Sequence, residues 1–537
     1  MKITIPTSIL QETEAEAFGF LRSLRKVDPT DLDTSSEVSI SALSDANMDE
    51  IRDIAERKGA GKFLRAFEAV IAARAGCTDL KVPSFEAFLP LLSEHLCQNK
   101  RDGWIYELCA DGSLLPWAIT SLRRRSDRSD RGEAPYVEMI GTGFGPMDKR
   151  LRVRTKVWTF QPTDVSRRGV ATILEGSGLY VETEALRLAH DEEATRFAGV
   201  LRDGFAAQFR ATGPFHNVSG HDLRNPRDVI GSRVIMDIDP DRIRNCPPEV
   251  ETRLFGGSAA PCFLELPQHP IVEVYSLETH EAFWINVANL TPYVYRPELR
   301  EKLILPQAQR DILDVLTTDT DMLTGDLVEG KSAGNVILTK GVPGVGKTLT
   351  AEIYAEVCGR PLYSVHAGNL GTSPREVAEA LRAVFQRAKR WGCVLLLDEA
   401  DVFVMTRGRD VVQNAIVAEF LRTMEYFDGL LFMTTNRGDD IDEAILSRCA
   451  AIIHYDPPGP DLLPEVWRVM SENFDAGLQA PLITELVRLF PQITPRDVKM
   501  LLRLTLRVAK SRSEPLNADL FRRNAMFRGI NAKDCEK

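Results

Sequence analysis

The sequence has no long apolar stretch. None of its 537 residues lies in a run approaching the roughly 18 apolar residues that a membrane-spanning helix requires. An acidic residue, Glu12, also comes too early for a secretory signal peptide. We therefore expect a soluble, cytoplasmic protein without a membrane span.

Patterns typical of metal sites and disulfide frameworks are missing as well. The nine cysteines are scattered and never take CxxC spacing, so we expect reduced thiols that lie mostly in the core. The eight histidines form no ligand pattern, and a structural role best explains the closest pair, His216 and His221. The sequence therefore predicts no structural metal site.

An overall excess of basic residues is also absent. The chain has 66 Lys and Arg against 77 Asp and Glu, a net charge of −11, which argues against attraction of the whole protein to nucleic acid. A local basic face remains an alternative, although a solvated helical face explains the same residues equally well. These are Arg496, Lys499, Arg503, Arg507, Lys510, Arg512, Arg522, Arg523 and Arg528.

The composition that is present is that of a folded multidomain protein, with 44% hydrophobic residues. Apolar residues at helical spacing from Ile51 to Ile71 and from Phe85 to Leu96 predict helices near the amino terminus. The charged stretch from Arg123 to Arg131 lacks apolar anchors and predicts a loop or domain boundary. We assign residues 1–133 to a mainly helical region.

The hydrophobic period then changes to two. Alternation from Leu151 to Trp158 and from Val234 to Asp239 predicts strands, and the segments 271–275 and 282–287 predict a hairpin. We assign residues 134–298 to a β-rich recognition domain, because no catalytic set of side chains stands out within it.

A phosphate-binding loop follows. Residues 335–340 have the pattern of a buried strand and lead directly into GVPGVGKT, which fits GxxxxGK[ST]. Its glycines allow backbone N–H groups to approach phosphate oxygens, Lys347 can meet the β and γ phosphates of ATP, and the Thr348 hydroxyl can bind Mg²⁺. The predicted nucleotide-binding residues here are Gly341, Pro343, Gly344, Val345, Gly346, Lys347, Thr348 and Leu349.

A second apolar strand, 393–397, ends in two acids. Parallel strands deliver such acids to one edge of a sheet. We expect Asp398 to hold Mg²⁺ through water and Glu399 to orient the water that attacks the γ phosphate. Asp401 is expected to support the turn.

Two further residues complete the predicted chemistry. Asn436 follows a third apolar strand, where its amide can hold the lytic water. Arg448 ends the segment IDEAILSR and is our arginine-finger candidate, acting on a neighbouring subunit, with a surface ion pair as the alternative. A finger in trans implies a ring.

These ordered motifs resemble the AAA ATPases. The resemblance covers about residues 300 to 525 and rests on GKSAGNVILTKGVPGVGKTLTAE, RPLYSVHAGNLGTSPREV, CVLLLDEADVF, FLRTMEYFDGLLFMTTNR and IDEAILSRCA. Within the family, the sequence is most similar to a poorly characterised group of fungal AAA-domain proteins with a β-rich N-terminal domain, and more distantly to the mitochondrial inner-membrane AAA ATPases.

The resemblance implies an α/β fold. We expect a P-loop AAA module with a parallel, Rossmann-like sheet at 299–458, a helical lid and tail at 459–537, and assembly into a hexamer. It also places Arg496 where related proteins carry a second sensor of the γ phosphate. An ordinary exposed helix arginine is the alternative there.

The loops expected to line the ring's pore depart from the family pattern. Related unfoldases carry an aromatic residue where this chain has 368–371, and only Leu370 is available for a weak apolar grip. The second loop, near 406–413, offers the charges of Arg407, Arg409 and Asp410. Threading of a polypeptide is therefore not implied.

Three functions remain open. The leading hypothesis is a Mg-ATP-dependent ATPase that remodels or dissociates protein targets chosen by the N-terminal domains. The alternatives are a nucleotide-controlled oligomeric switch or scaffold, favoured by the non-aromatic pore loop, and a nucleic-acid-dependent ATPase, favoured by the basic C-terminal run.

Overall fold

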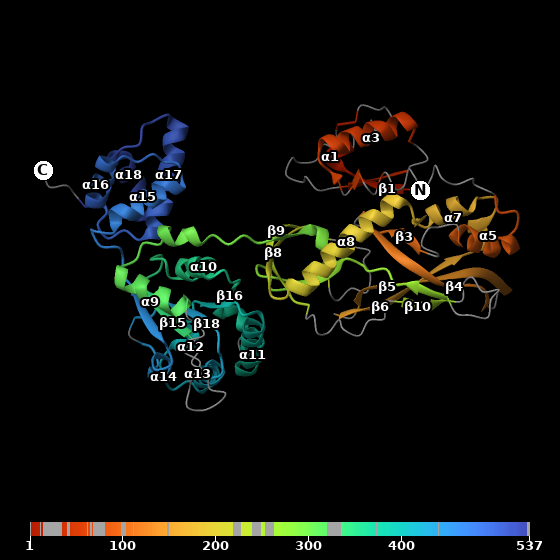
Figure 1. Cartoon of the computed structure of the whole chain (residues 1–537). Coiled ribbons are helices and arrows are strands. Elements are labelled where there is room, and N and C mark those ends of the chain that lie inside the picture. Colours follow the sequence, from red (N-terminus) through yellow and green to blue (C-terminus); the bar gives the residue numbers. More distant parts are fainter. Residues whose placement is uncertain are drawn as a thin grey trace. The chain divides into compact units, whose positions relative to one another are not determined.

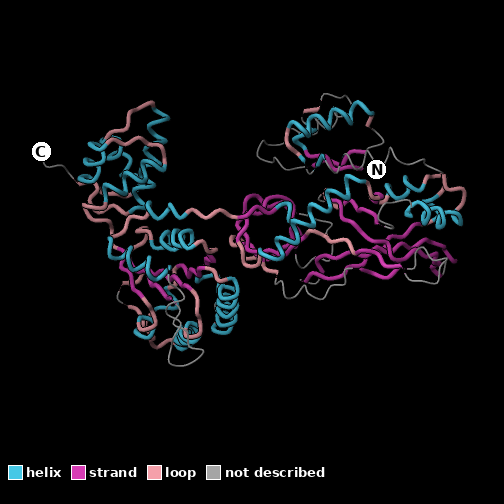
Figure 2. The backbone as a smooth tube through the Cα atoms, viewed as in Figure 1, coloured by secondary structure: helices cyan, strands magenta, loops and turns pink. Residues whose placement is uncertain are grey.

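The computed structural model of this chain describes residues 2–10, 12–13, 35–39, 43–61, 63–64, 67, 81–97, 104–110, 112–129, 132–147, 150–217, 227–238, 249–252, 262–318, 335–371, 373–438 and 440–533. The chain divides into two compact units, Met1–Tyr293 and Val294–Lys537, and Figure 2 distinguishes their helices from their strands. Some predictions concern residues outside the described ranges: Val70, Ile71, Asp130, Arg131 and His221.

The first unit begins with a strand pair and helices. Antiparallel pairing joins β1 (Lys2–Pro6) to β2 (Ser35–Ser39), with α1 (Thr7–Leu10) after β1. The next described helices are α3 (Asp45–Arg57) and α5 (Phe85–Cys97). Their buried residues include Ile51, Ile54, Phe88, Leu92 and Leu96. The predicted stripe from Phe85 to Leu96 is therefore confirmed, whereas α3 ends at Arg57, before the predicted stripe from Ile51 to Ile71 is complete.

An antiparallel sheet follows in the order β6-β5-β4-β3-β7. Its strands are β3 (Trp104–Leu108), β4 (Leu114–Ser129), β5 (Gly132–Met147), β6 (Arg150–Phe160) and β7 (Leu179–Val181).

The expected helical character up to residue 133, and the expected loop from Arg123, are wrong at this sheet. The backbone of β4 pairs with β5, and Arg125 forms a 2.9 Å ion pair with Glu138 on that strand. Arg124 lies 5.5 Å from the ring of Phe85. These partners are distant in sequence, so local composition gave no sign of them.

The rest of the first unit is β-rich. It contains α6 (Pro162–Val165), α7 (Val170–Gly176), α8 (Glu184–Asp203), β8 (Gln208–Asn217), β9 (Arg227–Met236), β10 (Glu249–Thr252), β11 (Cys262–Glu265), β12 (Ile271–Ser276), β13 (Ala282–Asn286), η4 (Val287–Asn289) and β14 (Leu290–Pro292). The predicted hairpin and the strand at 151–158 are confirmed, whereas β9 ends at Met236, before the predicted end of the strand at 234–239. An extra pairing of β13 with β8 joins non-adjacent strands of the order β13-β12-β9-β8-β14. The 20-residue helix α8 was not predicted.

The second unit contains a parallel sheet in the order β16-β17-β18-β15-β19. The strands are β15 (Asn335–Gly341), β16 (Leu362–His366), β17 (Val394–Asp398), β18 (Leu430–Thr435) and β19 (Ala451–Tyr455). Continuous apolar runs suit a sheet that is covered on both faces. The predicted α/β class with a five-stranded parallel sheet is therefore confirmed.

Helices surround this sheet and form the lid (Figure 1). The helices of the sheet domain are η5 (Pro297–Lys302), α9 (Gln307–Thr318), α10 (Lys347–Cys358), η6 (Ala367–Leu370), α11 (Pro374–Trp391), α12 (Asp401–Val404), α13 (Val411–Met424) and α14 (Glu443–Leu446). The lid consists of α15 (Leu463–Asn473), α16 (Ala480–Leu489), α17 (Pro495–Arg512), α18 (Ala518–Ala525) and η7 (Met526–Arg528). Trp467, Leu486, Leu501 and Phe521 lie in one core within it.

The structure also bears on the expectations about cysteines and about membrane-spanning helices. Of the described free cysteines, Cys393 is buried, whereas Cys109, Cys358 and Cys449 are partly buried. Burial raises the pKa of Cys393 and of Cys449 to about 12. Within the described ranges, no helix is both long enough and apolar enough to cross a bilayer.

Candidate active site

The predicted site residues lie at one edge of the parallel sheet. Strands β15, β17 and β18 are hydrogen-bonded neighbours in parallel register. Their carboxyl ends carry the glycine-rich loop, Asp398 and Asn436, respectively. The three apolar runs that predicted these strands therefore bring the three motifs together.

The loop between β15 and α10 depends on glycine at two positions. Gly341 has a φ of +152°, and a Cβ there would lie 2.1 Å from the carbonyl oxygen of Tyr455. Gly344 has a φ of +87°, and a Cβ there would lie 2.8 Å from Cβ of Arg496. A side chain at either position would both strain the backbone and collide with a neighbour. The loop ends at the amino terminus of α10, where unpaired N–H groups favour an anion.

Lys347 is held inside this loop. Its ammonium donates to the carbonyl oxygens of Gly341 (2.7 Å) and Val342 (2.9 Å) and to Oδ1 of Asn436 (2.9 Å). The residue is only 7% exposed, and burial lowers the pKa of Lys347, against the opposing effect of Asp401 and Asp398. A positive charge is thus fixed beside the loop, where phosphate oxygens can replace the carbonyl acceptors.

The residues expected to hold Mg²⁺ touch each other. The Thr348 hydroxyl donates to Oδ1 of Asp398 at 2.8 Å, and the Thr434 hydroxyl donates to the same oxygen at 2.6 Å. Among the described residues, no group of three or more His, Cys, Asp or Glu side chains is arranged for a metal. One hydroxyl and one carboxylate fit Mg²⁺, which usually keeps several waters and binds substrate phosphates.

Glu399 has an unusual backbone and a partner that the sequence did not predict. Its φ is +53°, and its amide donates to the Thr434 hydroxyl at 2.9 Å. Its carboxylate lies 3.0 Å from Nε2 of His366. Because Nδ1 of His366 accepts from the Gly368 amide at 3.0 Å, Nε2 carries the hydrogen and donates to Glu399. The one feature that could have indicated this partner is the position of His366 at the end of β16, a strand of the same sheet.

Asp401 supports the turn, as expected. It accepts hydrogen bonds from the Asn436 amide at 3.0 Å and from the Thr435 hydroxyl. These bonds fix the end of β18, and with it the position of the Asn436 side chain. A carboxylate that accepts from two neighbours is well suited to orient a loop.

The two candidate arginines are placed differently. The Arg496 amide donates to the Gly344 carbonyl at 3.1 Å, so the start of α17 touches the loop. Arg448 instead contacts residues of this chain that are not among the predicted site residues. Its guanidinium donates to the Ala444 carbonyl at 3.0 Å and lies 3.7 Å from Glu425. The structure therefore brings Arg496 to the site and does not bring Arg448 to it.

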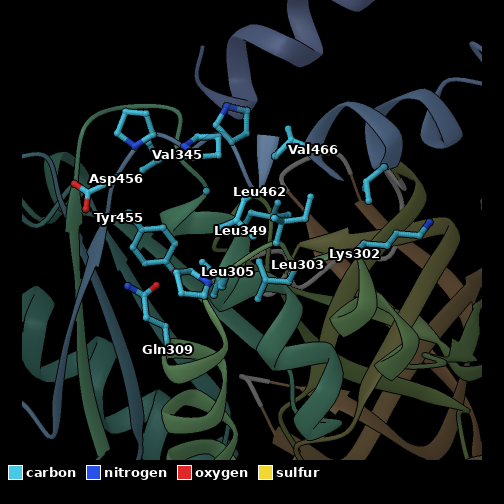
Figure 3. A pocket seen from close by; sticks show the side chains of 18 of the residues that line it. Lys302, Leu303, Leu305, Gln309, Val345, Leu349, Tyr455, Asp456, Leu462 and Val466 are labelled. Carbon is cyan, nitrogen blue, oxygen red and sulfur yellow. The ribbon is translucent and has the colours of Figure 1, made fainter. Parts of the chain in front are cut away.

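An apolar cavity of about 210 Å³ adjoins the loop (Figure 3). Its walls come from the segment before α9 and the first turn of that helix, the start of α10, the end of β19 with the residues after it, the lid helix α15, and the first residue of α17. Lining residues include Leu303, Leu305, Val345, Leu349, Tyr455 and Leu462. Because the cavity meets the loop at Gly346, it fits the base of a nucleotide whose phosphates lie on the loop. Sequence motifs do not reveal this cavity, since its walls come from five separate segments.

The exposed side chains of the two expected pore loops differ from those that the sequence predicted. Leu370 is 4% exposed, because its side chain is buried in this subunit, and so the weak grip expected of it is not supported. In the second loop, Arg407 is paired with Asp442 at 2.7 Å, whereas Val411 and Val412 are 79% and 50% exposed. The exposed surface there is partly apolar rather than only charged.

Comparison with known proteins finds relatives for the part of the chain that carries this site. Residues 337–457 match the family described as "ATPase family associated with various cellular activities (AAA)". An uncharacterized AAA family ATPase, y4kL, of Sinorhizobium fredii is 27% identical over 34% of this chain and 62% of its own length. The Homo sapiens ATPase family AAA domain-containing protein 3A is 30% identical over 32% of this chain and 30% of its own length.

A solved structure, the FIGL-1 AAA domain in complex with ADP, is 19% identical and covers 43% of this chain and 84% of that chain. Its TM-score of 0.34 is too low to support any detailed comparison. The match also spans less than two thirds of each of the two sequence relatives. From the family match and these relatives, we conclude that the chain contains an AAA family ATPase domain.

Proposed function

We propose that this protein is a Mg-ATP-dependent ATPase that hydrolyses ATP to ADP and phosphate. The observation that supports it best is the meeting of Lys347, Thr348, Asp398 and Asn436 at one sheet edge, beside an apolar cavity. Lysine neutralises phosphate charge, and a bound Mg²⁺ would add electrostatic stabilisation of the transferring phosphoryl group.

The protein's own groups have separate roles in this proposal. Thr348 and Asp398 would hold the metal, and Arg496 would approach the γ phosphate from the lid. Glu399 orients and polarises the attacking water, which Asn436 holds from the other side. The contact between Lys347 and Asn436 must be exchanged for phosphate contacts. Nucleotide binding therefore changes the partners of Lys347, whereas the Glu399 carboxylate has further acceptor positions for a water beside its bond to His366.

We further propose that the chain works as a homo-oligomeric ring, a hexamer, in the cytoplasm, and that it remodels protein targets selected by residues 1–298. The placement of Arg448 outside its own site supports action in trans. Membership of the fungal group with a β-rich N-terminal domain also remains a proposal.

A nucleotide-controlled switch or scaffold is the second candidate. The burial of Leu370 and the absence of an aromatic residue at 368–371 favour it, because both weaken the grip expected of a threading loop. A nucleic-acid-dependent ATPase is less favoured. It predicts stimulation by single-stranded nucleic acid that falls steeply between 50 and 200 mM salt, because phosphate contacts release counterions; a rate unaffected by nucleic acid would exclude it.

The proposed chemistry is tested with two variants. Lys347→Ala should abolish nucleotide binding, because it removes a phosphate contact. Glu399→Gln should bind ATP with nearly unchanged affinity but turn over at least about 100-fold more slowly, because only the water-orienting carboxylate is lost. Affinity is measured by calorimetry and turnover by phosphate release. Equal loss of ATP affinity in both variants would contradict the division of roles.

A further inference from the structure

One amide side chain at the cavity has a fixed orientation. Gln309, on α9, lines the cavity, and its Nε2 donates to the backbone carbonyl of His454 at 2.9 Å. Because a carbonyl oxygen only accepts, the NH₂ group must face it. The amide oxygen therefore points elsewhere, and in Figure 3 it is drawn on the side of the amide that faces Leu305.

A second polar side chain of this wall, that of Tyr455, offers no hydrogen to a ligand. The Thr350 hydroxyl donates to the Gly346 carbonyl at 3.1 Å, and its oxygen lies 2.6 Å from the Tyr455 hydroxyl. Since the threonine hydrogen is used on Gly346, the tyrosine hydroxyl must donate to the threonine oxygen. Burial raises the pKa of Tyr455, so the phenol keeps that hydrogen at neutral pH.

The charged groups of Lys302 and Asp456 do not alter this pattern. Lys302 and Asp456 line the cavity, but in Figure 3 their charged ends lie at its margins and point away from the labelled apolar residues. The wall formed by Gln309 and Tyr455 therefore presents a hydrogen-bond acceptor beside an apolar interior.

We propose that Gln309 selects a 6-aminopurine nucleotide over a 6-oxopurine nucleotide. Its amide oxygen accepts from the exocyclic amino group of adenine and repels the 6-oxo group of hypoxanthine or guanine. This inference rests on the proposed function, since it takes the cavity to hold the base. A site that pairs with one purine leaves an unpaired acceptor against the other, which lowers affinity about tenfold to a hundredfold.

Adenosine and inosine diphosphates provide the test, because they differ at position 6 of the purine. Neither carries a γ phosphate, so hydrolysis does not interfere with the measurement of binding. Calorimetry with the full chain and Mg²⁺ gives the ratio of their dissociation constants. We expect ADP to bind at least about tenfold more tightly to the wild type, and Gln309→Leu to reduce that preference to less than about threefold. Gln307→Leu is the matched control, because Gln307 lies on the same helix and donates to Asp311. Its ratio should equal that of the wild type.

Gln309→Ala serves as a second variant, and a melting curve without nucleotide shows whether each variant is folded. The inference is overturned if the wild type binds both diphosphates equally, or if both Gln309 variants keep the wild-type ratio. If the wild type binds neither diphosphate, the proposed function itself fails. A wild type that binds both with equal affinity refutes only the role of Gln309.

Discussion

His269 is a buried histidine enclosed in the first unit. Its Nε2 lies 2.8 Å from the Pro116 carbonyl, and its ring centroid lies 4.6 Å from that of Trp117. A Cβ at Gly143 or Gly145 would come within 2.6 or 2.8 Å of the ring, so these glycines make room for it. Burial, followed by the charge of Arg154, lowers its pKa to about 3.

This shift predicts acid sensitivity of the first unit. Between pH 6.5 and about 3, the unfolded chain binds a proton that the folded unit excludes, so stability is lost as the pH falls. The free energy of unfolding should drop by about 1.4 kcal/mol per pH unit in that window. Urea unfolding followed by tryptophan fluorescence at pH 7, 6 and 5 measures the drop.

His269→Gln keeps a donor for the Pro116 carbonyl but does not titrate. Its stability should depend less on pH, with a slope reduced by about one proton. His454→Gln, at an exposed histidine of the second unit, is the control and should keep the wild-type slope. An unchanged slope in His269→Gln would contradict the assignment.

The roles of residues that belong to a motif with fixed spacing could be predicted from the sequence. The roles of residues that depend on contacts between distant segments could not. Lys347, Thr348 and Asp398 follow from motifs whose chemistry demands those residue types. His366 and Gln309 carry no motif. Their importance comes from Glu399 and from the His454 carbonyl, each contributed by a distant segment.

At the scale of elements, three side chains join η5, α9 and the P-loop helix α10. Arg300 pairs with Asp314, and the Tyr354 hydroxyl donates to the same carboxylate at 2.9 Å. Although burial raises the pKa of Asp314, its hydrogen bonds to Arg300 and Tyr354 hold it below its usual value. The entry segment of the second unit is thus tied to the helix that begins the nucleotide site.

Loss of this carboxylate should loosen the contact. Asp314→Asn should destabilise the second unit by about 1–3 kcal/mol, because it leaves two donors with a weaker acceptor. Asp311→Asn is the matched control, since Asp311 accepts from Gln307 on an exposed part of the same helix. Denaturant unfolding followed by circular dichroism gives both values, and equal destabilisation would argue against a special role for the network.

Elements whose burial follows one local pattern were predicted correctly. The strands β15, β17 and β18 are continuous apolar runs, and α3 and α5 show helical spacing. The end of β4 was missed because its arginines are stabilised by α5 and β5 rather than by an apolar period. The helix α8 was missed because few of its residues are buried: two apolar residues, Leu186 and Phe197, and the polar residue His190.

At the scale of the whole molecule, the described residues of the candidate site all lie in the second unit. The loop, the acids and the cavity come from residues after Val294. A fragment spanning 294–537 should therefore fold and hydrolyse ATP at a basal rate within about threefold of the full chain, while losing target selection. Phosphate release and circular dichroism check this expectation. A folded, assembled fragment without ATPase activity would show that the first unit completes the site or the ring.

Arg448 connects the single site to the proposed ring. Within its own subunit it contacts Ala444 and Glu425, and the alternative candidate, Arg437, pairs with Asp440 at 2.9 Å. If Arg448 neutralises phosphate charge in a neighbour, Arg448→Ala should bind ATP but lose about 10³-fold in turnover. Calorimetry and phosphate release separate these two effects. Loss of ATP affinity equal to that of Lys347→Ala would instead indicate a structural role.

A mixture of two inactive variants distinguishes trans action from chemistry within one subunit. In a ring of Arg448→Ala and Glu399→Gln subunits, some interfaces join an intact Glu399 to an intact Arg448 from the next subunit, so a trans finger predicts partial recovery of turnover. Chemistry within one subunit predicts none, because every subunit then lacks one of the two groups. Subunit exchange must be shown first, and mixtures with wild type show whether a ring tolerates inactive neighbours. If exchange occurs, inactive neighbours are tolerated and no ratio restores turnover, Arg448 is not a trans finger and Arg437 becomes the next residue to substitute.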